Sequence, residues 1–334
     1  MIEIQNLYKY YGSKRALGPI SATIEQGEIV GLLGLNGAGK TTTLRILACD
    51  LLPSSGSVKI DGVDVVEHPE QVRARIGYLP DRPPLYDEMS VDEFLRFVAR
   101  LRGFGTDGLA QRVGEVVEST GLGGVQHDPI GSLSHGYRQR VGIAQAIVHR
   151  PKLVVLDEPI SGLDPVQIVE MRDLVRRLAG EHTVIVSSHI LGEISETCDR
   201  ILVVGDGKIV ASGSEAELTS QLAGSSQVLL TVRCPQGARS SLEQALAGLS
   251  EVTAVKATTA TELGADVCSY EISCQSEIRE RVVATAVSAG AGVLQLVRAE
   301  KELESVFLRL AGEGTRRVAS DDAAATSPAV SANS

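Results

Sequence analysis

The sequence predicts an α/β fold over residues 1–222, followed by a smaller α+β domain over residues 225–312. In the first region, short apolar runs of strand type alternate with amphipathic segments of helical spacing, which is typical of a largely parallel sheet covered on both faces. A glycine-rich loop at residues 34–41 lies between one such strand and one such helix. After residue 225 the order changes to strand, helix, strand, strand, helix, strand.

The composition is that of an acidic globular protein. The net charge is −10, and aromatic residues make up 3% with no tryptophan, so we expect no nucleic-acid-binding surface. The five cysteines form no C-x-x-C pair, which favours reduced thiols in a cytoplasmic protein. Residues 1–6 lack the features of a signal peptide, and no apolar run approaches the roughly 18 residues that span a bilayer. If the protein works at a membrane, we expect another chain to supply the spanning part.

The elements of the first region follow in order along the chain. Residues 1–26 predict two strands joined by a turn at Gly12, and residues 56–66 predict a hairpin centred on Asp61 and Gly62. Residues from about 84 to 150 have helical spacing and predict a helical subdomain. The remaining expected elements are strands at 153–156, 184–186 and 201–204 and a helix at 167–179.

The smaller domain begins after a break at Gly224 and Ser225. Its order of elements predicts a split-βαβ, ferredoxin-like arrangement. A last helix at residues 303–310 carries an apolar stripe and ends the domain near residue 312. Residues 313–334 are mostly Ala, Ser and Asp with little to bury, so we expect a disordered tail. Because the domain contains no phosphate loop and no paired catalytic carboxylates, we expect it to be a non-catalytic accessory domain.

The glycine-rich loop carries the most specific pattern in the chain. It fits G-x-x-x-x-G-K-[ST], and the strand before it and the helix after it are the context that a P-loop needs. Its backbone N–H groups and the helix N-terminus favour bound phosphates. Lys40 is expected to reach the β- and γ-phosphates of ATP, and the Thr41 hydroxyl to bind Mg²⁺. The candidate nucleotide-binding residues of the loop are Gly34, Asn36, Gly37, Ala38, Gly39, Lys40, Thr41 and Thr42.

An alternative interpretation of this loop is the turn of a dinucleotide-binding fold. That turn requires G-x-G-x-x-G, and position 42 is Thr, so we reject it.

A second candidate half of the site lies at residues 153–158, an apolar strand that ends in two carboxylates. On a sheet that also carries the P-loop, Asp157 is placed to hold Mg²⁺. Glu158 is then within reach of a water in line with the γ-phosphate, as a general base must be. Such a strand end is common, but its position 117 residues after Lys40 makes the pair a strong indication of ATP hydrolysis.

Further segments complete an ordered set of motifs. They are Tyr11 with Gly12, Asp81 after a strand, Ser134 to Gln139 at the start of a helix, 161–164, and His189 at a strand end. In this order residues 1–220 resemble the ATP-binding cassette (ABC) ATPases. The resemblance assigns Tyr11 to the adenine-stacking A-loop, with Tyr10 and Tyr8 as alternatives, and Asp81 to the Q-loop. It assigns Ser134 to the signature motif, Asp164 to the D-loop and His189 to the switch histidine.

The resemblance implies a P-loop α/β fold with a mixed sheet, an antiparallel β subdomain and a helical subdomain. It also implies two cassettes paired head to tail around two ATP molecules, either as a homodimer or with a related cassette. Ser134 and Gly136 of one cassette would hold the γ-phosphate that Lys40 of the other binds, and Asp164 would join the nucleotide-binding residues. His189 would orient the phosphate and the attacking water.

Two motifs depart from the family pattern. The signature motif usually reads Leu-Ser-Gly-Gly-Gln, and here His135 and Tyr137 replace a Gly-type position and the Gln. Because Ser134 and Gly136 are kept, we expect activity to survive. The Q-loop glutamine is replaced by Asp81, which is shorter and cannot donate a hydrogen bond when ionised but can still approach Mg²⁺ and act in catalysis.

Three segments narrow the resemblance within the family. Tyr78–Asp81, Pro83–Tyr86 and Leu133–Arg140 resemble the cassettes of type-2 ABC exporters, including the gliding-motility-associated branch. We therefore expect an exporter ATPase on the inner face of the cell membrane, held there by an integral membrane permease of the type-2 kind.

The permease is expected to insert a short helix near residues 81–102. Candidate contacts are Arg82, Phe94, Phe97 and Arg100, although the two phenylalanines could belong to the core. The alternative function is a soluble ABC ATPase that acts on ribosomes or DNA. Such proteins carry two cassettes or long coiled-coil insertions, and this chain has neither.

Overall fold

The computed structural model describes residues 1–222, 226–258, 266–274 and 278–299. Two compact units divide these residues, the first comprising Met1–Glu215 and the second beginning at Ala216. The predicted helix at 303–310 and the predicted tail at 313–334 lie outside the described residues.

An antiparallel sheet of four strands opens the first unit, in the order β2-β1-β4-β5. The strands are β1 (Ile2–Tyr11), β2 (Lys14–Ile24), β4 (Ser55–Ile60) and β5 (Val63–Asp64). The predicted turn at Gly12 joins the first two, and the predicted Asp61-Gly62 turn joins β4 to β5. The antiparallel subdomain is thereby confirmed.

A six-stranded sheet forms the centre of the first unit, in the order β10-β9-β3-β8-β7-β6. Its strands are β3 (Ile29–Leu33), β6 (Ile76–Leu79), β7 (Leu153–Asp157), β8 (Thr183–Ser188), β9 (Arg200–Gly205) and β10 (Lys208–Gly213). Neighbouring strands are parallel except β10, which runs antiparallel to β9, so the predicted mixed sheet is confirmed. Every residue of β3, β7 and β8 is buried, as expected of central parallel strands.

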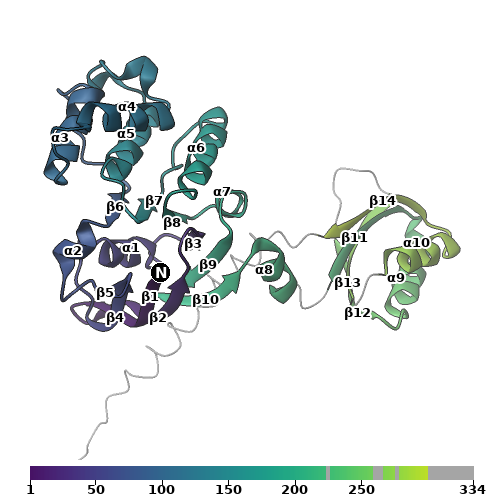
Figure 1. Cartoon of the computed structure of the whole chain (residues 1–334). Helices are drawn as coiled ribbons and strands as arrows, with labels where there is room; N and C mark the ends of the chain where they lie inside the picture. Colours follow the sequence, from purple (N-terminus) through teal and green to yellow (C-terminus); the bar gives the residue numbers. More distant parts are fainter. Residues whose placement is uncertain (223–225, 259–265, 275–277, 300–334) are drawn as a thin grey trace, which may run out of the picture. The chain divides into compact units, whose positions relative to one another are not determined.

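Helix α1 (Lys40–Leu47) follows β3 and packs between the two sheets (Figure 1). Its residues Leu44 and Leu47 share one core cluster with Leu7 of β1 and Leu202 of β9. The other helices beside the sheets are α2 (Pro69–Arg73), α6 (Pro165–Leu178) and α7 (Leu191–Ser195), and α8 (Glu215–Leu222) begins at the boundary between the two units. The P-loop therefore lies between a buried strand and a helix fixed by apolar packing.

Three helices form the predicted helical subdomain, which Figure 1 shows grouped apart from the two sheets of the first unit. They are α3 (Val91–Leu101), α4 (Leu109–Ser119) and α5 (His135–Ile147). A capping box begins α3, because the Ser90 hydroxyl accepts from the Glu93 backbone while the Glu93 carboxylate accepts from the Ser90 backbone. Two short 3₁₀ turns, Gly123–Val125 and Ile130–Ser132, connect α4 to α5.

The helical subdomain is joined to the central sheet at β6. A side chain at Gly77 would lie 2.0 Å from the carbonyl oxygen of Ala146, so β6 and α5 meet backbone to backbone there. On either side of this contact, Gln145 Nε2 donates to the Tyr78 carbonyl at 3.0 Å and His149 Nε2 lies 3.1 Å from the Ile76 carbonyl. These contacts fix the C-terminal half of α5 on the sheet.

The second unit contains an antiparallel sheet of four strands in the order β12-β13-β11-β14. Its elements are β11 (Ser226–Arg233), the 3₁₀ turn Gln236–Ala238, α9 (Arg239–Ala247), β12 (Val252–Thr258), β13 (Val267–Cys274), α10 (Arg279–Ser288) and β14 (Gly292–Ala299). Both helices cover one face of the sheet, with Leu242 and Val282 packed against Leu230 and Tyr270 in a separate core (Figure 1). The predicted order of strands and helices is present.

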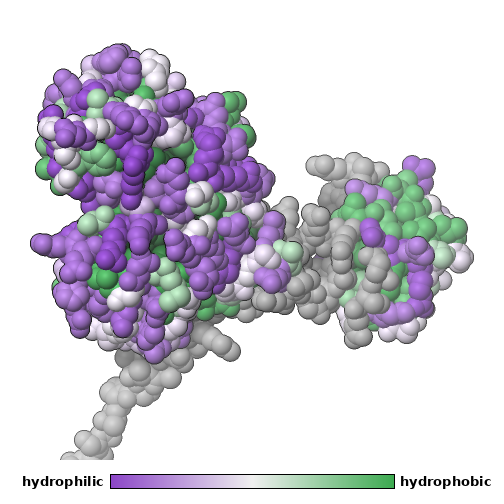
Figure 2. Space-filling model, in the orientation of Figure 1, coloured by the Kyte–Doolittle hydropathy of each residue, from purple (hydrophilic) through white to green (hydrophobic). Residues whose placement is uncertain are grey.

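Polar and apolar residues are distributed differently on the visible surfaces of the two units. Figure 2 shows mostly hydrophilic residues over the first unit and a gathering of apolar residues on the visible face of the second. Val287 and Leu294 are among the exposed apolar side chains of the second unit. Within the described ranges, no helix has the length and apolar character needed to cross a bilayer.

Candidate nucleotide-binding site

The P-loop connects β3 to α1 and is shaped by its glycines. Gly37 and Gly39 have φ angles of 84° and 109°, in a region that favours glycine. A side chain at Gly34 would lie 2.8 Å from the Val204 carbonyl, so this position also requires glycine. The loop lies at the C-terminal end of β3, and there the N-terminus of α1, which begins at Lys40, follows it.

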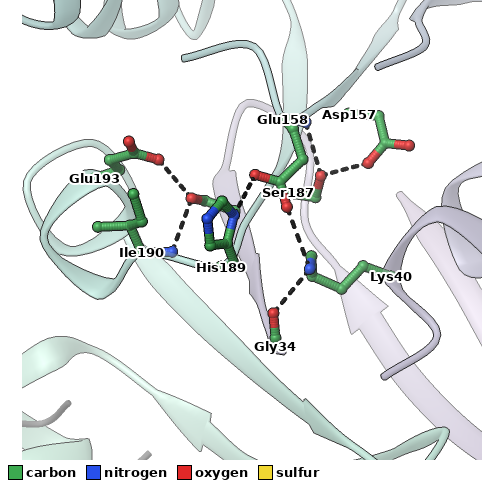
Figure 3. Close-up of polar contacts among 9 residues, drawn as sticks. Gly34, Lys40, Asp157, Glu158, Ser187, His189, Ile190 and Glu193 are labelled. Atoms are coloured by element: carbon green, nitrogen blue, oxygen red, sulfur yellow. Dashed lines mark hydrogen bonds and ion pairs between the residues drawn. The ribbon is translucent and has the colours of Figure 1, made fainter. Parts of the chain in front are cut away.

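Lys40 is the centre of a polar cluster. It is only 5% exposed, and its ammonium donates to the Gly34 carbonyl at 2.8 Å. It also lies 3.2 Å from Oε1 of Glu158, while Oε2 of the same carboxylate lies 2.9 Å from Nδ1 of His189 (Figure 3). The carboxylate of Glu158, the expected base, thus connects the P-loop lysine to the expected switch histidine.

Glu158 is held by its backbone as well as by its side chain. Its φ angle is 50°, a left-handed conformation that is uncommon for a residue with a side chain. Its N–H donates to the Ser187 hydroxyl at 2.9 Å, and Ser187 in turn donates to Asp157 at 2.6 Å. Strand register explains this chain of bonds, because Asp157 and Ser187 are direct partners in β7 and β8.

Asp157 has a carboxylate with spare capacity. It is 1% exposed, and its Oδ2 has no hydrogen-bond partner in the part of the chain that the structure describes. Burial raises the pKa of Asp157, and the Ser187 and Thr41 hydroxyls act against that rise. A buried carboxylate oxygen without a partner, next to the Thr41 hydroxyl, is an all-oxygen set that suits Mg²⁺.

A pocket of about 340 Å³ lies above the P-loop. Its walls come from the loop on one side and from the ends of β6, β7 and β8 on the other. The lining residues include Asn36, Gly37, Gly39, Lys40, Thr41, Thr42, Asp81, Glu158, Ser161 and His189. All of these residues except Ser161 were predicted from the sequence to belong to the site.

Asp81 is exposed after β6 and lines a second, larger groove as well. This groove of about 810 Å³ also has Thr41 and Asp157 in its wall, together with Arg82 and Arg102. Asp81 therefore lies between the phosphate pocket and the groove beside the helical subdomain. Phe94, suggested as a surface contact, is 2% exposed and belongs to the core.

Several predicted residues lie elsewhere. Tyr11 ends β1, the residue is 48% exposed, and the Lys9 ammonium lies 5.3 Å from its ring centroid. Ser134 caps α5 and accepts from Tyr137 N at 3.4 Å, and Asp164 caps α6 by accepting from Gln167 N at 2.9 Å. Gly136 and Asp164 line a third surface pocket of about 880 Å³. The signature motif and the P-loop of one chain thus lie on different pockets.

The residues that support the site from behind were not predicted from the sequence. Ser188 donates to Glu193 and accepts from the Ile190 backbone, which holds the turn that carries His189 (Figure 3). Burial raises the pKa of Glu193, and the Ser188 hydroxyl opposes this rise. The polar run 187–189 at a strand end was a visible signal for the two serines, whereas nothing in the sequence pattern pointed to Glu193.

Comparisons with known proteins point to the same family as the sequence motifs do. Residues 17–161 match the sequence model of the ABC transporter family. The bacitracin transport ATP-binding protein BcrA of Bacillus licheniformis is 32% identical over 328 residues, which cover 94% of this chain and 98% of that protein. The linearmycin resistance ATP-binding protein LnrL of Bacillus subtilis is 31% identical and covers 95% of this chain and 100% of its own.

A solved structure of an ABC transporter cassette has a similar fold. The dimeric structure of MJ0796, a bacterial ABC transporter cassette, superposes with a TM-score of 0.59 at 25% identity. It covers 64% of this chain and 98% of that cassette.

Proposed function

The chain belongs to the ABC transporter family and is the ATP-binding subunit of an exporter that couples ATP hydrolysis to transport. From this premise we propose which of its residues bind ATP, which hydrolyse it and which contact the permease. The observation that carries this proposal is the contact of Lys40 and His189 with the two oxygens of Glu158 above the P-loop. This contact supports the assignment of Lys40 as the cation for the phosphates, Glu158 as the base for the attacking water and His189 as the orienting group.

ATP binds with its phosphates in the P-loop pocket. The backbone of Gly34, Asn36, Gly37, Ala38 and Gly39 surrounds the phosphates, with Lys40, Thr41 and Thr42 at the start of α1. The exposed ring of Tyr11 is available to stack on the adenine.

Glu158 acts as the general base for the attacking water, and His189 orients that water and the γ-phosphate. Without nucleotide, the Glu158 carboxylate is engaged by Lys40 and His189. A γ-phosphate competes for Lys40 because both partners are anions, so binding releases one carboxylate oxygen to accept a proton. Substrate binding and activation of the base are thereby linked.

Mg²⁺ would be held by Thr41 and Asp157, with Asp81 nearby. When bound, it would neutralise charge on the phosphate oxygens. Ser187 keeps one oxygen of Asp157 engaged and so leaves the other oriented for the ion. Asp81 lines both the groove and the phosphate pocket, so its carboxylate can approach the metal from the groove side and take part in catalysis.

Two cassettes pair to form the complete sites, either as a homodimer or with a related cassette. The solved relative is a dimer, and here Gly136 and Asp164 lie on a pocket separate from the P-loop, while Ser134 caps the helix that carries Gly136. Ser134 and Gly136 at the N-terminus of α5 then bind the γ-phosphate held by Lys40 of the other cassette.

An integral membrane permease of the type-2 exporter kind docks in the groove beside the helical subdomain. Arg82 and Arg102 line this groove, and Asp81 links it to the phosphate pocket. The cassette then works on the inner face of the cell membrane, held there by the permease. Motif resemblance further supports the gliding-motility-associated branch, whereas the names of the two long relatives make an exported antibiotic the cargo class to test first.

Residues 1–222 form the nucleotide-binding domain, and residues 225–312 form an accessory domain of ferredoxin-like topology. The strand order β12-β13-β11-β14, with two helices on one face, supports that topology. No polar group of this domain is assigned a catalytic role.

The test is nucleotide binding and hydrolysis by the purified full chain. Lys40→Ala should weaken ATP binding because the phosphates lose their point charge. Lys59→Ala, on an exposed position of β4, is the matched control and should bind as the unaltered chain does. Equal ATP affinity in all three proteins would refute the assignment of the P-loop, and co-purification with a polytopic membrane protein tests the exporter role directly.

A further inference from the structure

His135 stands where the ABC signature motif usually has glycine, and its side chain makes a contact that glycine cannot. Its Nε2 lies 3.1 Å from the carbonyl oxygen of Ser161 in the same chain. A carbonyl only accepts, so the ring donates this bond through an Nε2–H. The bond connects the start of α5 to the turn that precedes α6.

Ser161 belongs to the other side of the chemistry. Its N–H donates to the Glu158 carbonyl at 3.2 Å, which closes the turn after the general base. Ser161 also lines the pocket above the P-loop of its own chain. The His135 bond therefore ends on a residue that lies in the phosphate pocket and is one hydrogen bond from Glu158.

A second contact holds the same two helix starts together. A side chain at Gly136 would lie 2.8 Å from Oε1 of Gln167, so α5 and α6 approach closely at their N-termini. Gln167 in turn donates its backbone N–H to Asp164, the cap of α6. A shift of the signature motif is thus passed to the turn 158–164 by packing as well as by the His135 bond.

We propose that His135 is a positioning residue that couples the two ATP sites of the cassette pair. This inference rests on the proposed function, in which Ser134 and Gly136 meet the ATP of the partner while Ser161 faces the ATP of its own chain. Occupation of the partner's site fixes the start of α5, and the His135–Ser161 bond transmits that order to the turn that carries Glu158. Glycine at position 135 would leave this connection to packing alone.

The coupling should appear as cooperativity. Two linked sites give a Hill coefficient for ATP hydrolysis of up to about 2. Loss of one hydrogen bond near solvent changes an equilibrium by roughly fivefold, so the coefficient should fall toward about 1 while each separate P-loop still binds nucleotide. ADP affinity reports the P-loop alone, because ADP lacks the phosphate that the signature motif holds.

The experiment compares His135→Asn with His135→Gln in the full-length protein. The Gln amide extends to the position of Nε2 and can donate to Ser161, whereas the Asn amide is one bond too short. His127→Asn, on an exposed histidine of the helical subdomain, is the control. The expected result is a lowered Hill coefficient in His135→Asn only, with ADP affinity and melting temperature unchanged in all three variants.

Three results would overturn the inference. The first is a wild-type Hill coefficient of about 1, the second is an unchanged coefficient in His135→Asn beside a cooperative wild type, and the third is a fall in melting temperature that accompanies the lost cooperativity in both His135 variants. A wild-type chain that neither binds nor hydrolyses ATP would instead reject the proposed function. The third result would assign His135 a merely structural role.

Discussion

The two units of this protein contain different kinds of buried polar groups. In the first unit Lys40, Asp157 and Glu193 are buried in or behind the phosphate pocket, and Oδ2 of Asp157 has no partner in the described part of the chain. In the second unit the polar residues that are buried, within its described ranges, are Thr231 and Ser269, whose hydroxyls bond to each other at 3.0 Å. Two buried groups that hydrogen-bond to each other stabilise the fold, whereas a buried oxygen without a hydrogen-bond partner is available to a ligand.

The largest expected effect comes from the carboxylate that Lys40 and His189 share. Glu158→Gln keeps the size of the side chain but removes its ability to accept a proton, so turnover should fall by a factor of about 10²–10⁴. ATP binding should persist and a nucleotide-bound dimer should accumulate, as measured by steady-state hydrolysis and light scattering. Glu118→Gln on the exposed face of α4 is the control. Near-normal hydrolysis by Glu158→Gln would show that Glu158 is not the general base of the first unit.

A smaller effect is expected at Asp81, at the boundary between the phosphate pocket and the groove. Asp81→Gln should retain a good part of the basal hydrolysis, because an amide oxygen can still approach the metal. Asp81→Ala should lose the stimulation by the permease. Hydrolysis of the complex reconstituted with its permease distinguishes these outcomes, and an equal loss in both variants would show that the carboxylate itself is needed.

The polar pair of the second unit should affect stability without affecting chemistry. Thr231→Val leaves the Ser269 hydroxyl without its partner and should cost about 1 kcal/mol in the free energy of unfolding. Adding Ser269→Ala should recover part of that loss, because both polar groups are then gone. Denaturant unfolding and ATP hydrolysis are measured on the same samples. A loss of hydrolysis in the folded double variant would contradict the separation of roles.

The smallest effect is expected from removing the second unit. Truncation after Gly224 should leave ATP affinity unchanged, because the P-loop pocket is lined by residues of the first unit. Isothermal titration of the truncated and full-length chains compares the affinities, and light scattering shows whether dimerisation changes. A truncated chain that folds yet fails to bind ATP would place the second unit in the active site.

The sequence was sufficient for the groups whose chemistry depends on local spacing. The pattern from Gly34 to Thr41 is enough to predict a P-loop. The alternation of strands and helices predicts that Asp157, 117 residues after Lys40, lies on the same sheet. The contacts of Ser187 depend on the register of β7 and β8, which spacing along the chain does not specify. Glu193 and the His135–Ser161 bond depend on how separate elements pack, so no local pattern predicted them.

The seam between Gly77 and Ala146 has a mechanical consequence. The two backbones touch there, and the hydrogen bonds of Gln145 and His149 flank the contact, so sliding of the helix that carries the signature motif would break these contacts, whereas a tilt about the seam would keep them. From Ala146 to Ser134 the helix forms an arm of about 18 Å, from a rise of about 1.5 Å per residue. A turn of about 10° at the seam would move the tip of that arm by about 3 Å, which is the length of a hydrogen bond. A slight tilt of α5 about Gly77 would thus be enough to make or break a contact between Ser134 and a phosphate.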